Sequence, residues 1–120
     1  MERLEGKIDK GWGYENIWVT NDLYCGKMLV FTEKGNKSSM HFHEEKDETW
    51  YVQSGEFEVN WIDTETAKIN VDKLKVGDTW NNPPLLPHQL HCIEPGTILE
   101  VSTRDCPEDN YRVLAGDSQK

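Results

Sequence analysis

Short stretches of alternating apolar and polar residues run through most of the chain, and turn-forming residues separate them. In 56–63, for example, Phe57, Val59 and Trp61 recur at every second position, which is the period of a strand with one buried face. No long segment shows helical periodicity. Further strands are predicted, with Gly, Pro, Asn or Asp between them, over 24–32, 39–43, 48–53, 67–71, 79–80, 89–93 and 97–103. The predicted fold class is therefore all-β with little helix, as a sandwich or barrel.

The chain has the length of one domain, with 120 residues and no internal repeat or linker. We expect a single domain over 1–120, made of an N-terminal arm (about 1–24), a barrel (about 25–104) and a C-terminal segment (about 105–120). The last segment is polar, and we expect it to run back over the surface with room for one short helix.

The charge balance excludes several classes of partner. The net charge is −9, which repels phosphate backbones and anionic membranes, so neither nucleic acid nor a membrane is an expected partner. The N-terminal residues contain no secretion signal or apolar span, and the odd set Cys25, Cys92 and Cys106 matches no CxxC motif. These features favour free thiols and a cytoplasmic location.

Three of the four histidines, with one glutamate, form a candidate metal site: His41, His43, Glu48 and His88. His41 and His43 are two residues apart on a predicted strand, so they share one face. Glu48 opens the next strand, where an antiparallel neighbour would lie beside them. His88 follows a segment that three prolines stiffen (Pro83, Pro84 and Pro87).

Three imidazoles and a carboxylate suit one divalent ion, whether Zn, Mn, Fe, Ni or Co. Four protein ligands leave positions open for water or substrate oxygens. His91 lies three residues after His88 and would face the opposite side of a regular strand, so we expect it in packing or at the surface. Two histidines at this spacing are more often surface residues than ligands. The hypothesis of a metal site therefore depends on the wider sequence pattern around them.

That wider pattern resembles the two motifs of the cupin superfamily. The first motif matches at Gly35, His41, His43, Glu48 and Gly55, and the second at Gly77, Pro83 and His88. Leu85 stands where cupins usually have Gly, and Cys92 where they usually have Asn. The resemblance implies a single-domain double-stranded β-helix, or jelly-roll barrel, which holds the metal through these histidines and Glu48.

A narrower resemblance is to the cupin domains of the mannose-6-phosphate isomerase group, in 11–15, 39–43, 98–102 and 108–112. It implies a carbohydrate substrate and aldose–ketose isomerisation, in which the metal stabilises an enediolate. Glu100 is the candidate base, with a rim or ion-pair role as the equal alternative, and Glu48 could also serve. Arg112 or Lys37 would hold a phosphate.

Two other functions stay open: a non-catalytic sugar-binding or regulatory cupin, and a metal-dependent dioxygenase. Tyr51 and Trp80 are candidate pocket walls, although aromatic residues in a small barrel are usually core. The resemblance also suggests a homodimer. The apolar residues of 12–20 (Trp12, Tyr14, Ile17 and Trp18) could cover a partner barrel or only their own.

Overall fold

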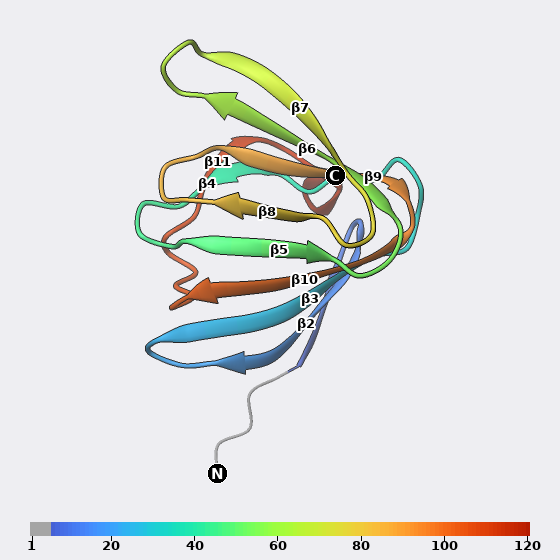
Figure 1. Cartoon of the computed structure of the whole chain (residues 1–120). Helices are drawn as coiled ribbons and strands as arrows, with labels where there is room; N and C mark the ends of the chain where they lie inside the picture. The colour runs from blue at the N-terminus through green and yellow to red at the C-terminus, as the bar shows by residue number, and fades with distance from the viewer. Residues whose placement is uncertain (1–5) are drawn as a thin grey trace.

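The computed structural model describes residues 6–120, in which two antiparallel sheets curve over one another (Figure 1). The larger sheet contains, in spatial order, β1 (Lys7–Lys10), β2 (Gly13–Thr20), β3 (Tyr24–Phe31), β10 (Gly96–Thr103), β5 (Glu48–Val52) and β8 (Thr79–Asn82). The smaller sheet contains β11 (Tyr111–Leu114), β4 (Met40–Phe42), β9 (His88–Glu94), β6 (Glu56–Asp63) and β7 (Lys68–Leu74). The predicted all-β class and barrel architecture are confirmed.

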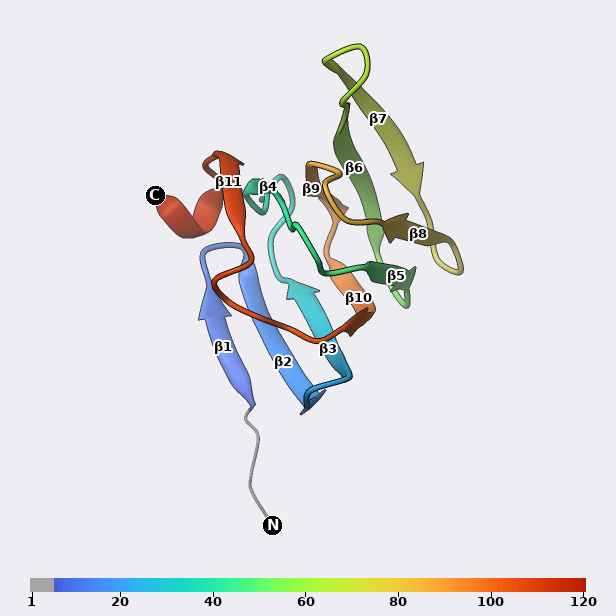
Figure 2. The same cartoon turned by 90° about the vertical axis from the view of Figure 1, so that its left-hand side faces the viewer.

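Both predicted flanking segments contribute strands. The predicted arm contains β1 and β2, which extend the larger sheet beyond β3; its first five residues lie outside the described part of the chain. The C-terminal segment contains β11, which pairs with β4, and a 3-10 turn over Asp117–Gln119. Figure 2 shows β1, β2 and β11 around the same side of the barrel. Residues 6–120 include no helix with the length and hydropathy needed to traverse a bilayer.

The core fills the space between the two sheets with side chains at alternate strand positions. Phe57 and Val59 are fully buried, as the period-2 pattern predicts, and Trp61 packs at the edge of the same cluster. Trp12 stacks on Phe31 with ring centroids 4.3 Å apart, so this residue of the predicted arm covers its own barrel. Burying one such large apolar side chain contributes roughly 1.5–3 kcal/mol.

The motif glycines occupy turns that need a left-handed backbone. Gly35, Gly55 and Gly77 have φ angles of +89°, +81° and +93°, a region that L side chains rarely adopt. Leu85 replaces the glycine of the second motif and still has a φ of +73°. Its N–H donates to the carbonyl of His43 at 2.7 Å, so the turn forms in spite of the side chain.

Candidate metal centre

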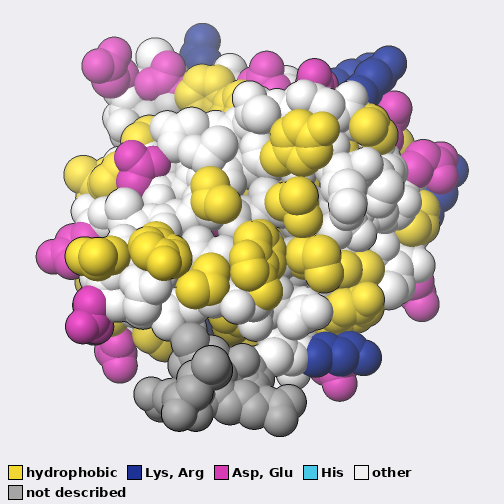
Figure 3. All heavy atoms as spheres, turned by 60° about the horizontal axis from the view of Figure 1, so that its bottom comes forward, with side chains coloured by type: hydrophobic (Ala, Val, Ile, Leu, Met, Phe, Trp, Pro, Cys, Tyr) yellow, Lys and Arg dark blue, Asp and Glu magenta, His cyan; other side chains and the backbone are white. Residues whose placement is uncertain are grey.

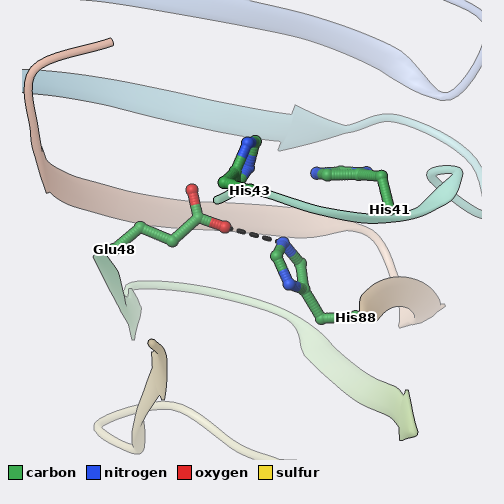
Figure 4. A group of neighbouring side chains, drawn as sticks. All are labelled: His41, His43, Glu48 and His88. Carbon is green, nitrogen blue, oxygen red and sulfur yellow. Dashed lines mark ion pairs between the residues drawn. The ribbon is translucent and has the colours of Figure 1, made fainter. Parts of the chain in front are cut away.

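His41, His43, Glu48 and His88 meet inside the barrel, on three different strands or their ends. One ligand atom from each lies within 4.8 Å of the others (Figure 4). His41 on β4 lies directly across from His88 on β9, and the ring centroids are 4.7 Å apart. His43 follows the end of β4, and Glu48 opens β5. The convergence predicted from the sequence is present in the fold.

Backbone carbonyls accept from Nδ1 of two of the three imidazoles, His43 and His88. Nδ1 of His43 donates to the carbonyl of Asp109 at 2.5 Å, and Nδ1 of His88 to that of Leu86 at 2.8 Å. Nδ1 of His41 lies 3.0 Å from the hydroxyl and 3.2 Å from the carbonyl of Ser39. Because a carbonyl oxygen only accepts, Nδ1 of His43 and Nδ1 of His88 each carry a proton, which leaves Nε2 as the ring atom that can bind an ion.

The free Nε2 atoms are buried, which is the direct test of whether the site fits a metal. Nε2 of His43 and Nε2 of His88 have no hydrogen-bond partner. The latter lies 2.8 Å from Oε1 of Glu48, so these two candidate ligand atoms face each other directly. Leaving buried polar atoms unpaired costs about 1–3 kcal/mol each. Coordination of one ion would satisfy all of these atoms, so the residues fit a metal.

The protonation states also suit coordination. Burial lowers the pKa of His41 to about 3 and lowers the pKa of His43 below its usual value. Burial alone would raise the pKa of Glu48, but His88 and Lys46 beside it hold that pKa well below its usual value. At neutral pH the site therefore presents neutral His41 and His43 rings with an ionised carboxylate, as a divalent ion requires.

Asn82 and Lys46 hold the carboxylate of Glu48 in place. The side-chain amide of Asn82 donates to Oε1 at 3.2 Å, while its own oxygen accepts from the indole N–H of Trp80 at 2.7 Å. Nζ of Lys46 lies 3.4 Å from Oε2. Outer contacts of this kind orient ligands and tune the affinity for metal.

A cluster of buried charges extends from Glu48 into the barrel. Lys46 donates to Asp105 at 2.9 Å and to Glu100 at 3.4 Å. Lys27 lies 3.8 Å from both Glu100 and Glu15. Glu100 also accepts from the indole N–H of Trp50 at 3.0 Å. The carboxylates hold the pKa of each lysine above its usual value, although burial opposes this.

The carboxylates of this cluster outnumber the lysines that contact them. When all are ionised, the four carboxylates (Glu15, Glu48, Glu100 and Asp105) face only two ammonium groups (Lys27 and Lys46). Uncompensated buried charge is strongly unfavourable. One dication would offset this excess when every carboxylate is ionised, and a proton on Glu100, whose pKa is raised by burial and by Glu48, would offset part of it.

A cavity of about 370 Å³ opens beside the four residues. Its lining includes Glu100, the apolar walls Trp50 and Leu29, and two cationic residues, Lys10 from β1 and Arg112 from β11. Neither cation forms an ion pair with any of residues 6–120. The cavity therefore combines the candidate metal ligands with groups that can hold a small, oxygen-rich anion.

Comparison with known proteins identifies the family. The family model for the cupin domain matches residues 28–102, which include all four candidate ligands. The chain belongs to the cupin family. No curated protein matches this cupin in sequence.

Solved structures share the cupin fold at low identity. Oxalate decarboxylase from Bacillus subtilis matches with a TM-score of 0.74 and 22% identity, over 90% of this chain and 29% of that one. The formate complex of oxalate decarboxylase from Lactobacillus farciminis matches at 0.71 and 19%, over 94% and 33%. KdgF from Halomonas sp. matches at 0.66 and 21%, over 79% and 81%. The cupin thus spans about a third or less of the length of these decarboxylases.

These matches support the superfamily and leave the narrower resemblance without support. None of the three structures is a mannose-6-phosphate isomerase, and identities near 20% establish the fold alone. Aldose–ketose isomerisation therefore remains a prediction for this cupin.

Of the residues proposed for the substrate pocket, the structure brings Glu100 and Arg112 to the cavity and leaves Tyr51, Trp80 and Lys37 outside it. The prediction that Tyr51 lines the pocket is wrong, because its position on β5 faces outward and its side chain is 45% exposed. Trp80 packs against Trp61 instead. Lys37 is exposed away from the cavity, and His91 lies on the far face of β9, 3.3 Å from Glu58.

Four further residues act on the site and were not predicted: Asn82, Asp109, Lys27 and Lys46. A signal existed for Lys27, because a charge inside the apolar run of β3 needs a buried partner. Lys46 lies in an acidic loop that reads as solvated, and only the fold reveals its burial. The backbone carbonyl of Asp109 carries no sequence signal at all.

Proposed function

We propose that this cupin is a metal-dependent enzyme acting on a small anionic carbohydrate, by aldose–ketose isomerisation. The observation that carries the proposal is a set of buried imidazole Nε2 atoms, free for coordination, facing a cavity whose lining includes two cations, Lys10 and Arg112. His41, His43, Glu48 and His88 are the proposed ligands. A bound divalent ion would supply Lewis-acid polarisation of substrate oxygens.

Side chains around the cavity would bind the substrate and transfer the proton. Arg112, with Lys10 across the cavity, would hold the phosphate or carboxylate of the substrate. Glu100 is the proposed proton carrier, because its carboxyl lines the cavity and because burial and the charge of Glu48 raise its pKa, which makes it a stronger base than an ordinary glutamate. Its proton would pass between adjacent carbons of the substrate.

The contacts of Glu100 also favour a second candidate, a sugar-binding cupin without turnover. Both carboxylate oxygens are engaged, Oε1 by Trp50 and Oε2 by Lys46 and Lys27. A group so fully paired would have to lose a contact before it accepts a proton. Tight binding of a sugar phosphate with no product would support this alternative.

The test is an assay of the full chain loaded in turn with Mn, Zn, Fe, Ni or Co. Mn is the first choice, because oxalate decarboxylase from Bacillus subtilis has Mn(II) centres. Substrates are mannose 6-phosphate, fructose 6-phosphate and, as the decarboxylase alternative, oxalate; oxygen uptake monitors the dioxygenase alternative. Interconversion of the sugar phosphates supports the proposal. Its absence with every metal removes isomerisation.

Two variants test the roles of the residues. Glu100→Gln should lower kcat about 100-fold or more while metal content stays unchanged. Arg112→Gln should raise KM at least about tenfold with a smaller change in kcat, because it removes ground-state binding of the anion. Arg104→Gln is the matched control, because Arg104 is exposed and does not line the cavity.

A further inference from the structure

Every charged residue in the central strands of the larger sheet lines the cavity. In β2, β3, β10 and β5 these residues are Glu15, Lys27, Glu100 and Glu48. Figure 3 shows the outer side of these strands, where uncharged side chains fill the middle and most charged ones lie toward the periphery. The proposed reaction uses Glu48 and Glu100, but it gives no role to Glu15 or Lys27.

The ammonium group of Lys27 is buried without a hydrogen bond to any of residues 6–120. Its side chain is only 9% exposed, and the carboxylate oxygens of Glu15 and Glu100 are both 3.8 Å from Nζ. The carboxylate of Asp105 is 4.0 Å away. Hydrogen bonds from nitrogen to oxygen are about 2.7–3.2 Å long, so these contacts are ion pairs only. The N–H groups of Lys27 therefore stay free to donate to a ligand in the cavity.

Glu15 provides an acceptor beside this free donor. Its side chain is 13% exposed, lines the cavity and accepts no hydrogen bond from residues 6–120. The gap between its Oε1 and Nζ of Lys27 is too wide for a direct hydrogen bond, but one oxygen atom beside both can lie about 2.8–3.0 Å from each. We expect water to fill this gap in the free protein, and a ligand oxygen can replace that water if it keeps both hydrogen bonds.

We propose that Glu15 and Lys27 form a subsite that binds one hydroxyl group of the substrate. The inference rests on the proposed function, because it takes the ligand to be a carbohydrate. A hydroxyl can accept from Lys27 and donate to Glu15 at the same time. A ligand anion would instead meet the three carboxylates around Lys27, and a ligand ammonium would meet Lys27 itself as a like charge.

The subsite and the candidate metal ligand Glu48 lie on opposite sides of Glu100. In the order of strands, β3 and β2 follow β10 on one side, and β5 follows it on the other. Glu100 is paired with Lys27 across one edge of β10 and with Trp50 across the other. A substrate held at both ends would therefore pass over Glu100, the proposed proton carrier. The subsite would then select sugars by a hydroxyl that does not react.

Isothermal titration calorimetry of the metal-loaded full chain tests the subsite without the need for turnover. The ligands are mannose 6-phosphate and its analogues that lack, in turn, the hydroxyl on carbon 3, 4 or 5. Glu15→Leu should weaken binding of mannose 6-phosphate at least about tenfold, because a hydrogen bond to a charged group is lost. One analogue should bind the parent and the variant equally, within about twofold, because it lacks the hydroxyl that the subsite binds.

Two further variants separate recognition from folding. Glu15→Gln keeps the size and an oxygen acceptor, so its loss of affinity should be smaller, with the same dependence on one hydroxyl. Glu58→Leu is the matched control, because Glu58 is a strand glutamate of the other sheet that contacts His91 outside the cavity. Circular dichroism and metal content establish that the variants fold; Glu15→Leu lowers the excess of carboxylates, so we expect it to do so.

Equal loss for every analogue would mean that Glu15 acts only through the fold, and this result would overturn the proposal. Parent-like affinity in Glu15→Leu, or a parent chain that binds none of these sugars, would overturn it as well. A dependence on Glu15 and one hydroxyl without conversion to fructose 6-phosphate would remove isomerisation and leave the subsite in place.

Discussion

Asp109 holds His43 through its backbone and the following loop through its side chain. Its carbonyl accepts from Nδ1 of His43 at 2.5 Å. Its carboxylate accepts from the backbone N–H groups of Glu44, Glu45 and Lys46 at 2.6, 3.0 and 3.1 Å. One residue of the C-terminal segment thus fixes both a proposed ligand and the turn that leads from it to Glu48.

Replacing this carboxylate should therefore weaken the metal site from a distance. Asp109→Ala leaves three N–H groups without their acceptor, and we expect a loss of about 1–2 kcal/mol in the free energy of unfolding. Metal affinity should fall about 10- to 100-fold, as for other contacts behind a ligand. Urea denaturation and titration with Mn²⁺ measure the two effects. Glu108→Ala is the control, because Glu108 is exposed and its carboxylate accepts from Cys106 rather than from this loop; an equal effect there would contradict the assignment.

Metal content should distinguish the two histidines of β9. His88→Ala removes a proposed ligand and should abolish stoichiometric binding, whereas His91→Ala, on the opposite face of the same strand, should retain it. Elemental analysis of the purified proteins measures this. In the parent chain, metal at 100 times its dissociation constant should stabilise the fold by about 2.7 kcal/mol, and a chelator should reverse the effect. Equal metal content in both variants would remove the proposed centre.

Lys46 should be essential to the fold without bound metal. Lys46→Met leaves three acidic groups, on Glu48, Glu100 and Asp105, without their shared ammonium. Removing one partner of buried charges costs about 3–5 kcal/mol, so thermal unfolding should shift far downward. A divalent ion should recover part of this loss. Lys75→Met changes an exposed lysine and should leave the unfolding temperature almost unchanged.

Leu85→Gly should stabilise the protein. The side chain is 58% exposed, so little packing is lost, and glycine relieves a φ of +73°. We expect a gain of roughly 0.5–1 kcal/mol, after the larger backbone entropy of glycine in the unfolded chain is taken into account. Leu23→Gly, at an exposed turn position without a positive φ, should instead destabilise. Chemical denaturation of the two variants gives the comparison.

The strands could be predicted because their period is short and local. Phe57, Val59 and Trp61 reveal their common face within six residues, and the spacing of His41, His43 and Glu48 matches a known motif. Both patterns can be recognised in a single sequence, because neither depends on contacts between residues far apart in the chain.

The charge network could not be predicted in the same way, because its pairs join residues far apart in the chain. Lys46 meets Glu100 across 54 positions, and His43 meets Asp109 across 66. For Tyr51 the prediction placed a residue in the pocket that does not belong there. Its aromatic ring suggested a pocket wall, but it alternates with the inward-facing Trp50 along β5 and therefore points outward. Sequence identifies which residues share a strand face, while the closure of the barrel decides which face is inside.

The strict alternation along β10 makes this strand unable to tolerate a shift in register. Sliding it by one residue against β3 and β5 would turn Val101 inward, beside the buried lysines, and would turn Glu100 outward, onto the face that carries Tyr51. A single inserted or deleted amino acid in 96–103 would therefore damage the interior and the exterior of the protein together.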